Sequence, residues 1–508
     1  MDLLDSPLDR SGPSPLHRQL YARIREAVLR GTLLPGTKLP STRRLCESLG
    51  VGRNTVIEAF DQLTAEGYLV ASQGSGTYVA TALPEEYLEA ARPFPGKRSR
   101  LDHTLGQSPI PVARPRGLSN RGKALARIAS IAPGPWKTHR ALLPGIPAYE
   151  LFPSRVWRKL QARYWTFEPD ARHLSYQPIA GYEPLRTAIS RHLRLSRGVV
   201  CEPDQIIVTP GSQYALDLAG RVLLDAGDPI WVEDPGYPPG RAAFIAAGAR
   251  VVPVSVDAEG LRVSDGLLRS PRARLAYVTP SHHYPLGVTM SLGRRMELLQ
   301  WAASSNAWIV EDDYDSELRY DGRPLPAMQG LDENGRVVYV GTFSKVLFPG
   351  LRLGYMVVPT NLVQLFLSAR AISDRHPPTV NQAVVADFLA EGHFTSHLRR
   401  LRATYQERQR ALLRAVTEEL DTLVDVHSDP AGTHLIAWLP PGVDDVAVSV
   451  ACAEVGISAP PLSAHFLTKR SQGGLLLGYT GFSTQIIASS VERLAREVPA
   501  AAWRAVSS

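Results

Sequence analysis

The most reactive residue types in the chain follow short apolar segments. The sequence Thr342-Phe343-Ser344-Lys345 comes directly after the apolar run 337–340, and Arg352 lies seven residues further on. A lysine amine can form a Schiff base with an aldehyde, as the cofactor pyridoxal 5'-phosphate (PLP) requires, while hydroxyl and guanidinium groups can hold the cofactor phosphate. Lys345 is therefore a candidate nucleophile, with three candidate phosphate ligands, Thr342, Ser344 and Arg352. A Ser-x-Lys loop by itself is common, and an ordinary surface lysine would explain it equally well.

A carboxylate and a phenol follow a second apolar run, 307–311. Ligands of an open α/β sheet bind at the carboxyl ends of its strands. At such an end, Asp312 can pair with a pyridine nitrogen and keep it protonated, and Tyr314 can donate a hydrogen bond to a phenolic oxygen. The alternative is that Asp312, Asp313 and Asp315 only cap a loop, which is the more common role of an isolated acidic cluster.

Two further turns follow apolar runs. Pro210-Gly211-Ser212-Gln213 separates the run 206–209 from a helical stretch, and a glycine turn before a helix N-terminus can hold a phosphate. Asp234-Pro235-Gly236-Tyr237 follows the run 229–232, and its tyrosine can stack on a flat ring. Each signal is weak alone, and Tyr237 could equally be ordinary packing.

The elements that must position these residues occupy the chain from about residue 136 to its end. Short runs rich in β-branched and aromatic residues are separated, for the most part, by amphipathic helical stretches. The runs are 206–208, 229–232, 275–278, 308–310 and 337–340. This alternation predicts an α/β domain, a mostly parallel sheet with helices on both faces.

The first 80 residues have a different, strongly helical pattern. Apolar residues between Leu16 and Val28 share one helix face, and Gly31 ends that helix. A short second helix begins at Ser41, and a third ends at Gly67 after a turn at Gly50. The run 68–79 then predicts a hairpin around a glycine-rich turn. This order predicts an α+β winged helix-turn-helix.

The polar residues of this segment lie where DNA would be read. Arg53, Asn54 and Thr55 open the third helix, with donors suited to base edges in the major groove. The start of the second helix can hold a phosphate, and glycines in the hairpin allow close backbone approach. The candidate DNA ligands are Ser41, Thr42, Arg43, Arg44, Arg53, Asn54, Thr55, Gly74 and Gly76. The alternative is a small helical interaction module with solvated arginines.

A proline-rich, basic stretch joins the two zones. It predicts a semi-extended linker without a core, and about 50 residues of flexible coil would span roughly 40 Å, close to the separation of DNA half-sites. The expected organisation is a tail over 1–13, a DNA-binding domain over 14–81, a linker over 82–135 and a PLP-binding domain over 136–508.

Composition limits the function classes. The net charge of +7 permits nucleic-acid binding without requiring it. The three cysteines, Cys46, Cys201 and Cys452, are too far apart for a disulfide framework or a zinc site, so we expect reduced thiols and no metal. No apolar run is long enough to span a membrane, and the acidic, proline-containing N-terminus is unlike a signal peptide. We therefore expect a cytoplasmic protein.

Two family resemblances agree with these readings. The run LPSTRRLCESLGVGRNTVIEAFDQLTAEGYLVASQGSGTYV resembles the GntR-type winged helix, which implies operator binding on double-stranded DNA by paired domains. Residues 140–500 resemble fold-type I aminotransferases in the four segments above, and also in Tyr176-Gln177-Pro178-Ile179-Ala180-Gly181 and Thr279-Pro280-Ser281-His282-His283-Tyr284-Pro285-Leu286-Gly287. The combination resembles the MocR/GabR-type regulators over almost the whole chain.

The resemblance implies a role for each candidate residue. Lys345 would form the Schiff base with PLP, Asp312 would contact the pyridine nitrogen and Tyr314 the phenolic oxygen. The phosphate would be held by Ser212, Gln213, Ser344 and Arg352, with Tyr237 against the ring. Tyr176 would reach the neighbouring subunit's site, so a homodimer is expected, which in this family is typically head-to-tail.

The chain departs from the aminotransferase pattern where the substrate carboxylate binds. By eye, the usual C-terminal arginine aligns with Leu476 and a second one with Pro239, although Arg241 or Arg375 could substitute. Losing a charge-assisted hydrogen bond costs about 1.5–3 kcal/mol. We therefore expect common amino acids to bind poorly and the protein not to be an efficient transaminase.

The function expected from these features is a DNA-binding transcription regulator. Its PLP-bound, aminotransferase-like domain would sense PLP or a PLP-reactive amine and alter operator binding. The alternative is a working PLP-dependent aminotransferase with an appended DNA-binding module. A third interpretation is an enzyme-shaped scaffold that binds no cofactor.

Overall fold

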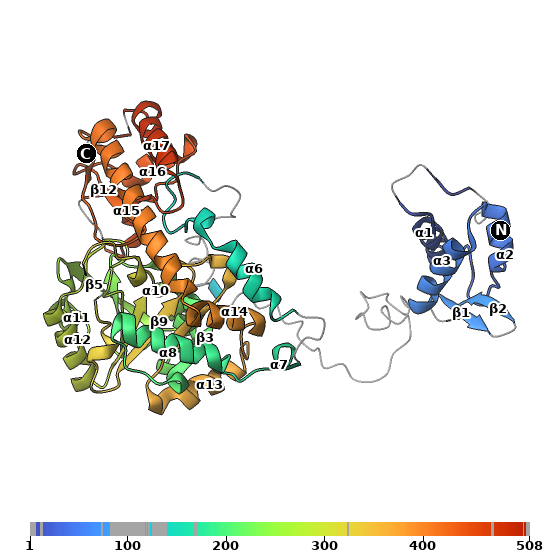
Figure 1. Ribbon diagram of the computed structural model, residues 1–508, viewed down its shortest axis with the longest axis horizontal. Helices are drawn as coiled ribbons and strands as arrows, with labels where there is room; N and C mark the ends of the chain where they lie inside the picture. Colours follow the sequence, from blue (N-terminus) through green and yellow to red (C-terminus); the bar gives the residue numbers. More distant parts are fainter. Residues whose placement is uncertain are drawn as a thin grey trace, which may run out of the picture. The chain divides into compact units, whose positions relative to one another are not determined.

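The computed structural model describes residues 7–10, 14–72, 75–81, 117, 119, 122–123, 140–165, 171–322, 325–468, 472–500 and 502–503. The chain divides into two compact units, Met1–Ala113 and Arg114–Ser508, whose helices and strands are labelled in Figure 1. Most of the expected tail (1–13) and linker (82–135) lies outside the described residues.

The first unit is a three-helix winged helix, as predicted. Its helices are α1 (Leu16–Leu29), α2 (Thr42–Leu49) and α3 (Arg53–Ala65), and its antiparallel hairpin consists of β1 (Leu69–Ser72) and β2 (Gly76–Val79). The fully buried residues Leu20, Ile24 and Val56 form its core with the other apolar faces of the helices. Because each helix buries only one stripe, the opposite faces remain available for a ligand.

Two local signals set the turn between α2 and α3. The hydroxyl of Ser41 accepts a hydrogen bond from the backbone N–H of Arg44, which caps the start of α2. At the other end Gly50 has φ +62°, a left-handed conformation that glycine adopts without steric cost. These two signals bring α3 into the helix-turn-helix arrangement.

The second unit contains an eight-stranded sheet with the order β3-β10-β9-β8-β7-β4-β5-β6. Strands β4, β5, β7, β8 and β9 are parallel to their neighbours in this group, whereas β10 and β6 are antiparallel to theirs. The strands are β3 (Ile206–Thr209), β4 (Pro229–Asp234), β5 (Arg250–Asp257), β6 (Gly260–Leu261), β7 (Leu275–Val278), β8 (Trp308–Asp313), β9 (Val337–Thr342) and β10 (Gly354–Val357). The predicted, mostly parallel α/β sheet is confirmed.

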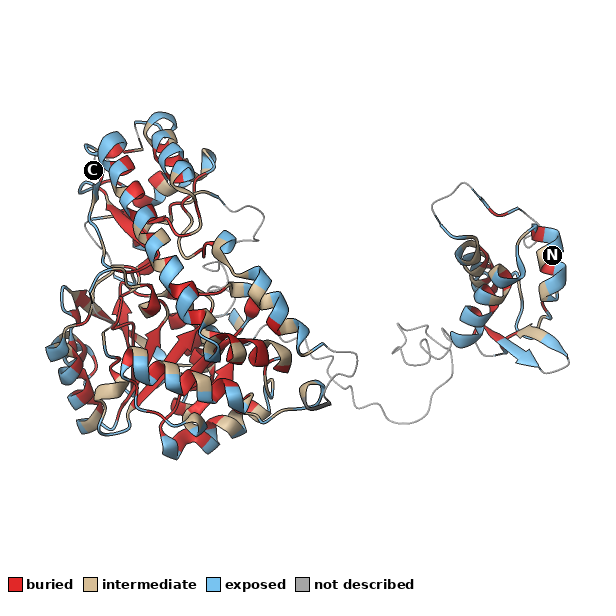
Figure 2. Ribbon diagram, viewed as in Figure 1, coloured by how far each residue is buried: buried red, intermediate tan, exposed pale blue. Residues whose placement is uncertain are grey.

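Helices cover both faces of this sheet, so most of its strand residues are buried (Figure 2), whereas buried residues alternate with less buried ones along β5. The core on one face includes Val208 and Tyr355, and neighbouring strand residues Ile207 and Met356 belong to the core on the other. The helices of this unit are α6 (Ser154–Ala162), α7 (Ala171–Leu174), α8 (Glu183–Arg197), α9 (Ser212–Leu223), α10 (Pro238–Ala247), α11 (Val263–Arg269), α12 (Leu292–Ser304), α13 (Val363–Ala371), α14 (Thr379–Ala390) and α15 (His393–Leu420).

A smaller antiparallel sheet follows the long helix α15. Its strands are β11 (Asp425–Val426), β12 (His434–Trp438) and β13 (Gly474–Gly478), and it is accompanied by α16 (Asp445–Glu454) and α17 (Thr484–Glu497). Within the described part of the chain, no helix is both long and apolar enough to cross a membrane. The three cysteines are free thiols, and Cys201 and Cys452 are buried.

Candidate cofactor site and DNA-reading surface

The carboxyl ends of the parallel strands bring the predicted cofactor residues to one edge of the sheet. Strands β8 and β9 are neighbours, with Asp312 opposite Val340, so that Asp312, near the end of β8, and the turn carrying Lys345, after β9, lie at the ends of adjacent strands. Asp234 ends β4, and Ser212 begins α9 directly after β3. Parallel strands end at the same edge of a sheet, which is where ligands bind in this architecture.

The amine of Lys345 lies close to the backbone of a segment 200 residues earlier. Its Nζ donates a hydrogen bond of 3.1 Å to the carbonyl of Gly145. A Cβ at Gly145 would lie 2.6 Å from this Nζ, and Gly145 has φ +75°, so a side chain there would collide with the amine. Burial lowers the pKa of Lys345, while the nearby carboxylates of Asp315 and Asp312 oppose that shift. A lowered pKa favours the neutral, nucleophilic amine.

Asp312 has one satisfied and one unsatisfied oxygen. Its Oδ2 accepts a hydrogen bond of 2.8 Å from the hydroxyl of Tyr277, whereas its Oδ1 is buried and has no partner among the described residues. Burial raises the pKa of Asp312 to about 7, against the Tyr277 hydrogen bond that lowers it. A buried carboxylate oxygen without a partner is costly. A protonated pyridine nitrogen is the partner it lacks, and the residues present therefore fit PLP.

The expected phosphate ligands meet at the start of α9. Gly211 precedes the helix with φ +109° and no side chain caps it, so the first backbone N–H groups of α9 remain available. The guanidinium of Arg352 lies 3.5–3.7 Å from the position a Cβ would take at Gly211. The N-terminus of α9 is the positive end of its helix dipole, and together with the neighbouring arginine it forms a suitable phosphate site.

The hydroxyl and amide ligands near this helix end are partly engaged. Thr342 Oγ1 contacts Ser344 Oγ at 3.0 Å and accepts a hydrogen bond from the Ser344 backbone N–H. The Gln213 side chain donates to the Pro239 carbonyl at 2.7 Å, which leaves its backbone N–H as the group that can face a phosphate. Ser212 lies at the first position of α9, where its backbone N–H and hydroxyl are both donors.

Aromatic side chains form the ring-binding part of the site. The Tyr237 and Tyr284 rings are 5.4 Å apart, and the Tyr284 and Tyr314 rings 6.0 Å apart, both edge to face. The Tyr314 hydroxyl lies 3.2 Å from Nδ1 of His282, which also contacts Asp315 at 2.8 Å and, through Nε2, Asp429 at 2.9 Å. Burial lowers the pKa of His282, but these two carboxylates raise it by more, which favours the protonated ring. The His282 ring holds the Tyr314 hydroxyl through the contact at Nδ1.

Tyr176 does not lie with the other candidates. Its side chain is 77% exposed, and the Arg375 guanidinium stacks over its ring at 4.8 Å. Trp165 and Leu174, both 58% exposed, line a nearby hollow together with His376, whose ring lies 6.1 Å from that of Tyr176. Large exposed apolar side chains in one place are typical of interaction surfaces. The role predicted for Tyr176, in a neighbouring subunit's site, stays a prediction.

The positions of the missing carboxylate ligands have distinct surroundings. Leu476 belongs to an apolar cluster with Ile436 and Leu462, and Pro239 lies in the first turn of α10. Of the two possible substitutes, Arg375 is stacked on Tyr176. Arg241 is only 8% exposed, and its Nη1 has no partner among the described residues.

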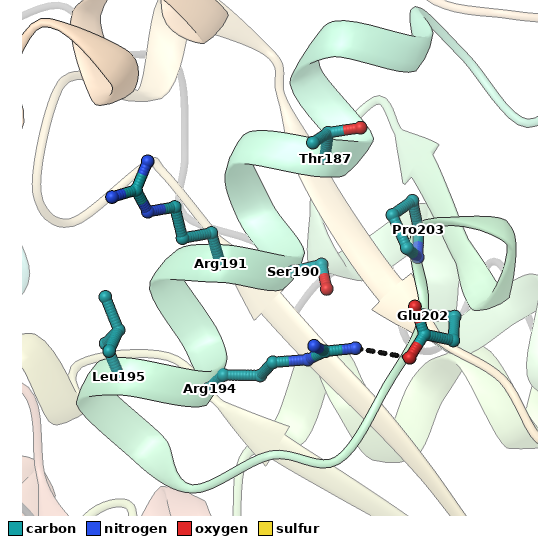
Figure 3. A pocket seen from close by; sticks show the side chains of 7 residues that line it. All are labelled: Thr187, Ser190, Arg191, Arg194, Leu195, Glu202 and Pro203. Carbon is teal, nitrogen blue, oxygen red and sulfur yellow. Dashed lines mark hydrogen bonds and ion pairs between the residues drawn. The ribbon is translucent and has the colours of Figure 1, made fainter.

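A surface hollow on α8 is a poorer candidate for a ligand site. Figure 3 shows the side chains around this hollow of about 360 Å³, with Arg194 directed toward Glu202. These two form an ion pair of 2.5 Å, and Arg194 also donates to the Cys201 carbonyl. The arginine charge is therefore already compensated, and none of the predicted cofactor residues lines the hollow.

In the first unit, the predicted reading residues lie on an open surface. Arg53 and Asn54 are exposed at the start of α3, and their side chains make no hydrogen bond or ion pair with the described residues. Arg43 is exposed and pairs with Glu47 at 3.2 Å, while Ser41, Thr42 and Arg44 surround the start of α2. Side chains without intramolecular partners are free to contact bases.

The hairpin adds one residue that the sequence did not indicate. Lys38 pairs with Tyr78 in an isolated bridge, and its Nζ lies 5.6 Å from the centre of the Tyr78 ring. Gly76 has φ +113°, and a Cβ there would lie 3.0 Å from the Lys38 side chain. Lys38 thus places a cation beside the hairpin, where it can contact a phosphate. Gly74 lies outside the described residues.

The Tyr277–Asp312 hydrogen bond leads to a pH-dependent prediction. Because the pKa of Asp312, about 7 in the folded protein, exceeds the 3.8 of an unperturbed side chain, its stabilising contribution is present at low pH and lost as the pH rises through about 7. A cofactor with a protonated ring nitrogen supplies the missing partner. We expect the gain in Tm on adding PLP to be larger at pH 8 than at pH 6. In Tyr277→Phe the pKa of Asp312 should rise further. The pH at which the PLP-induced gain in Tm increases should therefore move up by about 0.5–1 pH unit.

Tyr339→Phe is the matched control for this measurement. Tyr339 is a buried tyrosine on β9 that donates to Asp313, at 2.6 Å, rather than to Asp312. The Tm of each variant is measured from pH 5.5 to 9 with and without PLP. The midpoint of interest is the pH at which half of the increase in the PLP-induced Tm gain has occurred. If this midpoint is unchanged in Tyr277→Phe, or is displaced equally in Tyr339→Phe, the assignment of Asp312 to the ring nitrogen is contradicted.

The two units match separate protein families. Residues 145–461 match the family described as aminotransferase class I and II, and residues 16–79 match the bacterial regulatory proteins of the gntR family. Among solved structures, the α-aminoadipate aminotransferase LysN of Thermus thermophilus, in a complex with N-(5'-phosphopyridoxyl)-L-leucine, is similar with a TM-score of 0.65 and 32% identity. This similarity covers 70% of the chain and 91% of LysN.

Relatives that share both units are similar over nearly the full length. The probable rhizopine catabolism regulatory protein MocR of Rhizobium meliloti is 40% identical over 96% of the chain and 94% of its own length. The pyridoxine biosynthesis transcriptional regulator PdxR of Corynebacterium glutamicum is 32% identical over 94% of the chain and 95% of its own length.

Proposed function

This chain belongs to the MocR-type family of GntR regulators, and we propose that its PLP-bound domain senses PLP or a PLP-reactive amine and thereby alters operator binding. As a member of this family it is a DNA-binding transcription regulator with PLP as its cofactor. We also propose the cytoplasm as its location, because operator DNA is its target. The residues proposed to hold PLP are Lys345, Asp312, Tyr314, Tyr237, Ser212, Gln213, Thr342, Ser344 and Arg352.

The observation that carries the proposal is the buried Oδ1 of Asp312, which has no partner within the described part of the chain, together with an exposed Arg53 that makes no ion pair there. One unit thus has a buried acceptor suited to a protonated ring nitrogen, and the other has exposed residues suited to reading bases. When bound, PLP would supply an aldehyde group that reacts reversibly with amines, so that an effector amine could exchange with the amine of Lys345. Such an exchange changes the contents of the site without consuming the protein.

The proposed assembly is a homodimer, with a head-to-tail arrangement. The exposed Trp165, Leu174 and Tyr176 support it, because a partner subunit would cover them and receive Tyr176 at its own site. A ligand shifts an equilibrium only as far as its affinities for the two states differ. In this proposal, the two states differ in the geometry of the paired DNA readers.

The proposal is tested by measuring operator affinity with and without PLP. DNA from upstream of the protein's own gene and of adjacent genes is titrated with the full chain, in gel-shift experiments with and without PLP. We expect at least one fragment whose affinity changes when PLP is added. Unchanged affinity on every bound fragment, with PLP and with added amines, would contradict a sensing role.

Transamination of common amino acids is expected to be slow. At the position of the missing arginine, Leu476 is packed among apolar residues and offers no charge to a carboxylate. Each missing charge-assisted hydrogen bond weakens binding by about 1.5–3 kcal/mol, which corresponds to at least about tenfold. Incubation of the PLP-loaded protein with alanine or glutamate should leave the visible cofactor spectrum largely unchanged.

The alternative is a working aminotransferase, which the retained Lys345 and Asp312 favour. It is separated from the regulator by steady-state turnover with a panel of amine donors and keto-acid acceptors. Rapid, repeated conversion of the bound cofactor to its amine form by ordinary amino acids would support the enzyme and contradict the prediction above.

A further inference from the structure

One face of the small sheet carries a buried histidine beside the cofactor site. His434 and Ile436 lie on the same side of β12, and their partners on β13 are Gly478 and Leu476. Tyr284 packs against this face: its ring is 5.3 Å from that of His434, and it also contacts the rings of Tyr237 and Tyr314. His434 is thus one aromatic ring away from the residues proposed to surround PLP.

The two ring nitrogens of His434 differ in their surroundings. Nε2 lies 3.0 Å from the carbonyl of Pro285, an acceptor, so Nε2 carries the proton and donates. Nδ1 is therefore an acceptor, and it is buried without a partner among the described residues, in a side chain only 3% exposed. An unsatisfied buried acceptor is expensive unless a ligand supplies a hydrogen-bond donor.

The charge of His434 limits what that ligand can be. Burial lowers the pKa of His434 to about 4, and the charges of His282 and Lys345 contribute in the same direction. The imidazole is neutral at pH 7, so it does not attract a carboxylate. It instead requires an O–H or N–H group.

Two further unsatisfied atoms belong to His465, which contacts Tyr284, and to Arg241, whose charge acts on His465. His465 stacks on Tyr284 at 5.2 Å, and its Nδ1 is also buried without a partner among the described residues. The charge of Arg241 contributes to lowering the pKa of His465, and Arg241 has the unpartnered Nη1 described above. The lining thus offers an acceptor at His434 and a donor at Arg241.

An unpartnered histidine nitrogen is not by itself a ligand site, as His397 demonstrates. His397 is 1% exposed, contacts the carbonyl of Val346 at 2.8 Å through Nε2, and has an unpartnered Nδ1. Its ring neighbours, however, are Phe152 and Phe388 in the main core. His434 differs in facing the aromatic residues of the cofactor site and in sharing an electrostatic interaction with Lys345.

We propose that the effector wall, defined as Tyr284, His434, His465 and Arg241, binds a small hydroxylated primary amine. A hydroxyl is the group that both donates and accepts: one hydroxyl donates to Nδ1 of His434, and a hydroxyl oxygen of the same ligand accepts from Nη1 of Arg241. The carbon skeleton packs against Tyr284 and the apolar cluster that contains Leu476. This inference rests on the proposed function, since it names the amine that the PLP-bound domain recognises.

Three small amines of similar shape test the proposal. Serinol (2-amino-1,3-propanediol), isopropylamine and alanine are titrated by calorimetry into the PLP-loaded full chain. Isopropylamine lacks both hydroxyls of serinol, and alanine has a carboxylate in place of one carbon substituent. We expect serinol to bind at least about tenfold more tightly than isopropylamine, or about 1.4 kcal/mol, because only serinol supplies hydroxyl donors to the buried unsatisfied acceptors. Tighter binding of alanine than of serinol would show that Arg241 takes a carboxylate and would overturn the proposal. Equal affinities for serinol and isopropylamine would overturn the proposal.

A pair of variants locates the hydroxyl contact. In His434→Gln the amide nitrogen can replace Nε2 as donor to Pro285, while no atom replaces Nδ1. His397→Gln makes the same change in the main core. We expect His434→Gln to lose the preference for serinol and keep its PLP affinity, and His397→Gln to retain both. A serinol preference that survives in His434→Gln overturns the assignment, whereas its loss supports it.

The same samples separate this inference from the proposed function. If operator affinity responds to PLP or to amines while serinol has no advantage, only the effector class is wrong. If neither PLP nor any amine changes operator affinity, the sensing role itself fails. The comparison of the three amines in the unmodified protein decides the effector class even if a variant does not fold.

Discussion

Replacement of Lys345 by alanine is expected to abolish the visible absorbance of the protein-bound cofactor and to weaken PLP binding by at least about 100-fold, or about 2.7 kcal/mol. The Lys345 amine is the nucleophile, which donates a hydrogen bond to the Gly145 carbonyl, and within the described residues it is the lysine amine that acts on Asp312. Without it, PLP retains only noncovalent contacts with the phosphate and ring ligands. The loss should therefore be large although the pocket is intact.

The measurement is a titration of PLP into cofactor-free protein, followed by absorbance and by the change in Tm. Lys159→Ala is the matched control, because Lys159 is an exposed lysine on α6 and contributes nothing to the cofactor site. Lys345→Ala should also lose any response of operator binding to amines. Retention of the visible spectrum in Lys345→Ala, or its loss in Lys159→Ala, would show that another amine holds the cofactor.

The DNA reader could be predicted almost completely from the sequence. The apolar stripe from Leu16 to Val28 predicted a first helix, which the structure places at Leu16–Leu29. Ser41 and Gly50 marked the limits of the second helix through their capping preferences. Helical periodicity and caps depend on residues within a few positions of one another, so a local pattern is sufficient. The position of Lys38 beside the hairpin could not be predicted, because its contact with Tyr78 joins segments that are 40 residues apart.

The cofactor site was predictable only where it follows strand ends. Asp312, Tyr314 and Lys345 each come just after an apolar run, and the parallel sheet brings those ends together. The sequence does not indicate a functional role for Tyr277, because it lies inside a strand in which all residues are buried. A tyrosine in such a strand is expected to be an ordinary core residue. Its hydroxyl contacts Asp312 across 35 residues of sequence, a pairing that sheet order creates and that no local spacing reveals.

The residues of the effector wall could be grouped even less from the sequence, because tertiary structure alone brings them together. The segment from Thr279 to Gly287 matches a motif of the aminotransferases that the sequence resembles, but nothing in the sequence places its Tyr284 against His434, 150 residues away. The absence of an arginine at Leu476 was visible beforehand, and the structure adds what surrounds that position: apolar side chains and neutral histidines. A sequence can indicate that an expected group is missing, but not which neighbours take over its surface.

Replacement of Arg53 by alanine is expected to weaken operator binding by about 10–100-fold while PLP affinity stays unchanged. Arg53 is exposed at the first position of α3 and has no partner among the described residues, so its guanidinium is free to contact a base edge. Loss of a bidentate contact between an arginine and a guanine removes about 1–3 kcal/mol of discrimination. Affinity for the operator should therefore fall much more than affinity for unrelated DNA of the same length.

Arg43→Ala is the comparison variant for Arg53→Ala, because it removes a phosphate contact rather than a base contact. Arg43 lies at the start of α2 and already pairs with Glu47, so its expected DNA contact is with a phosphate. Its removal should weaken operator and unrelated DNA about equally and reduce the salt dependence of log K by about one unit. Fluorescence anisotropy at several salt concentrations distinguishes the two patterns. Equal loss on both DNAs in Arg53→Ala would remove it from base reading, and loss of PLP in that variant would contradict two separable modules.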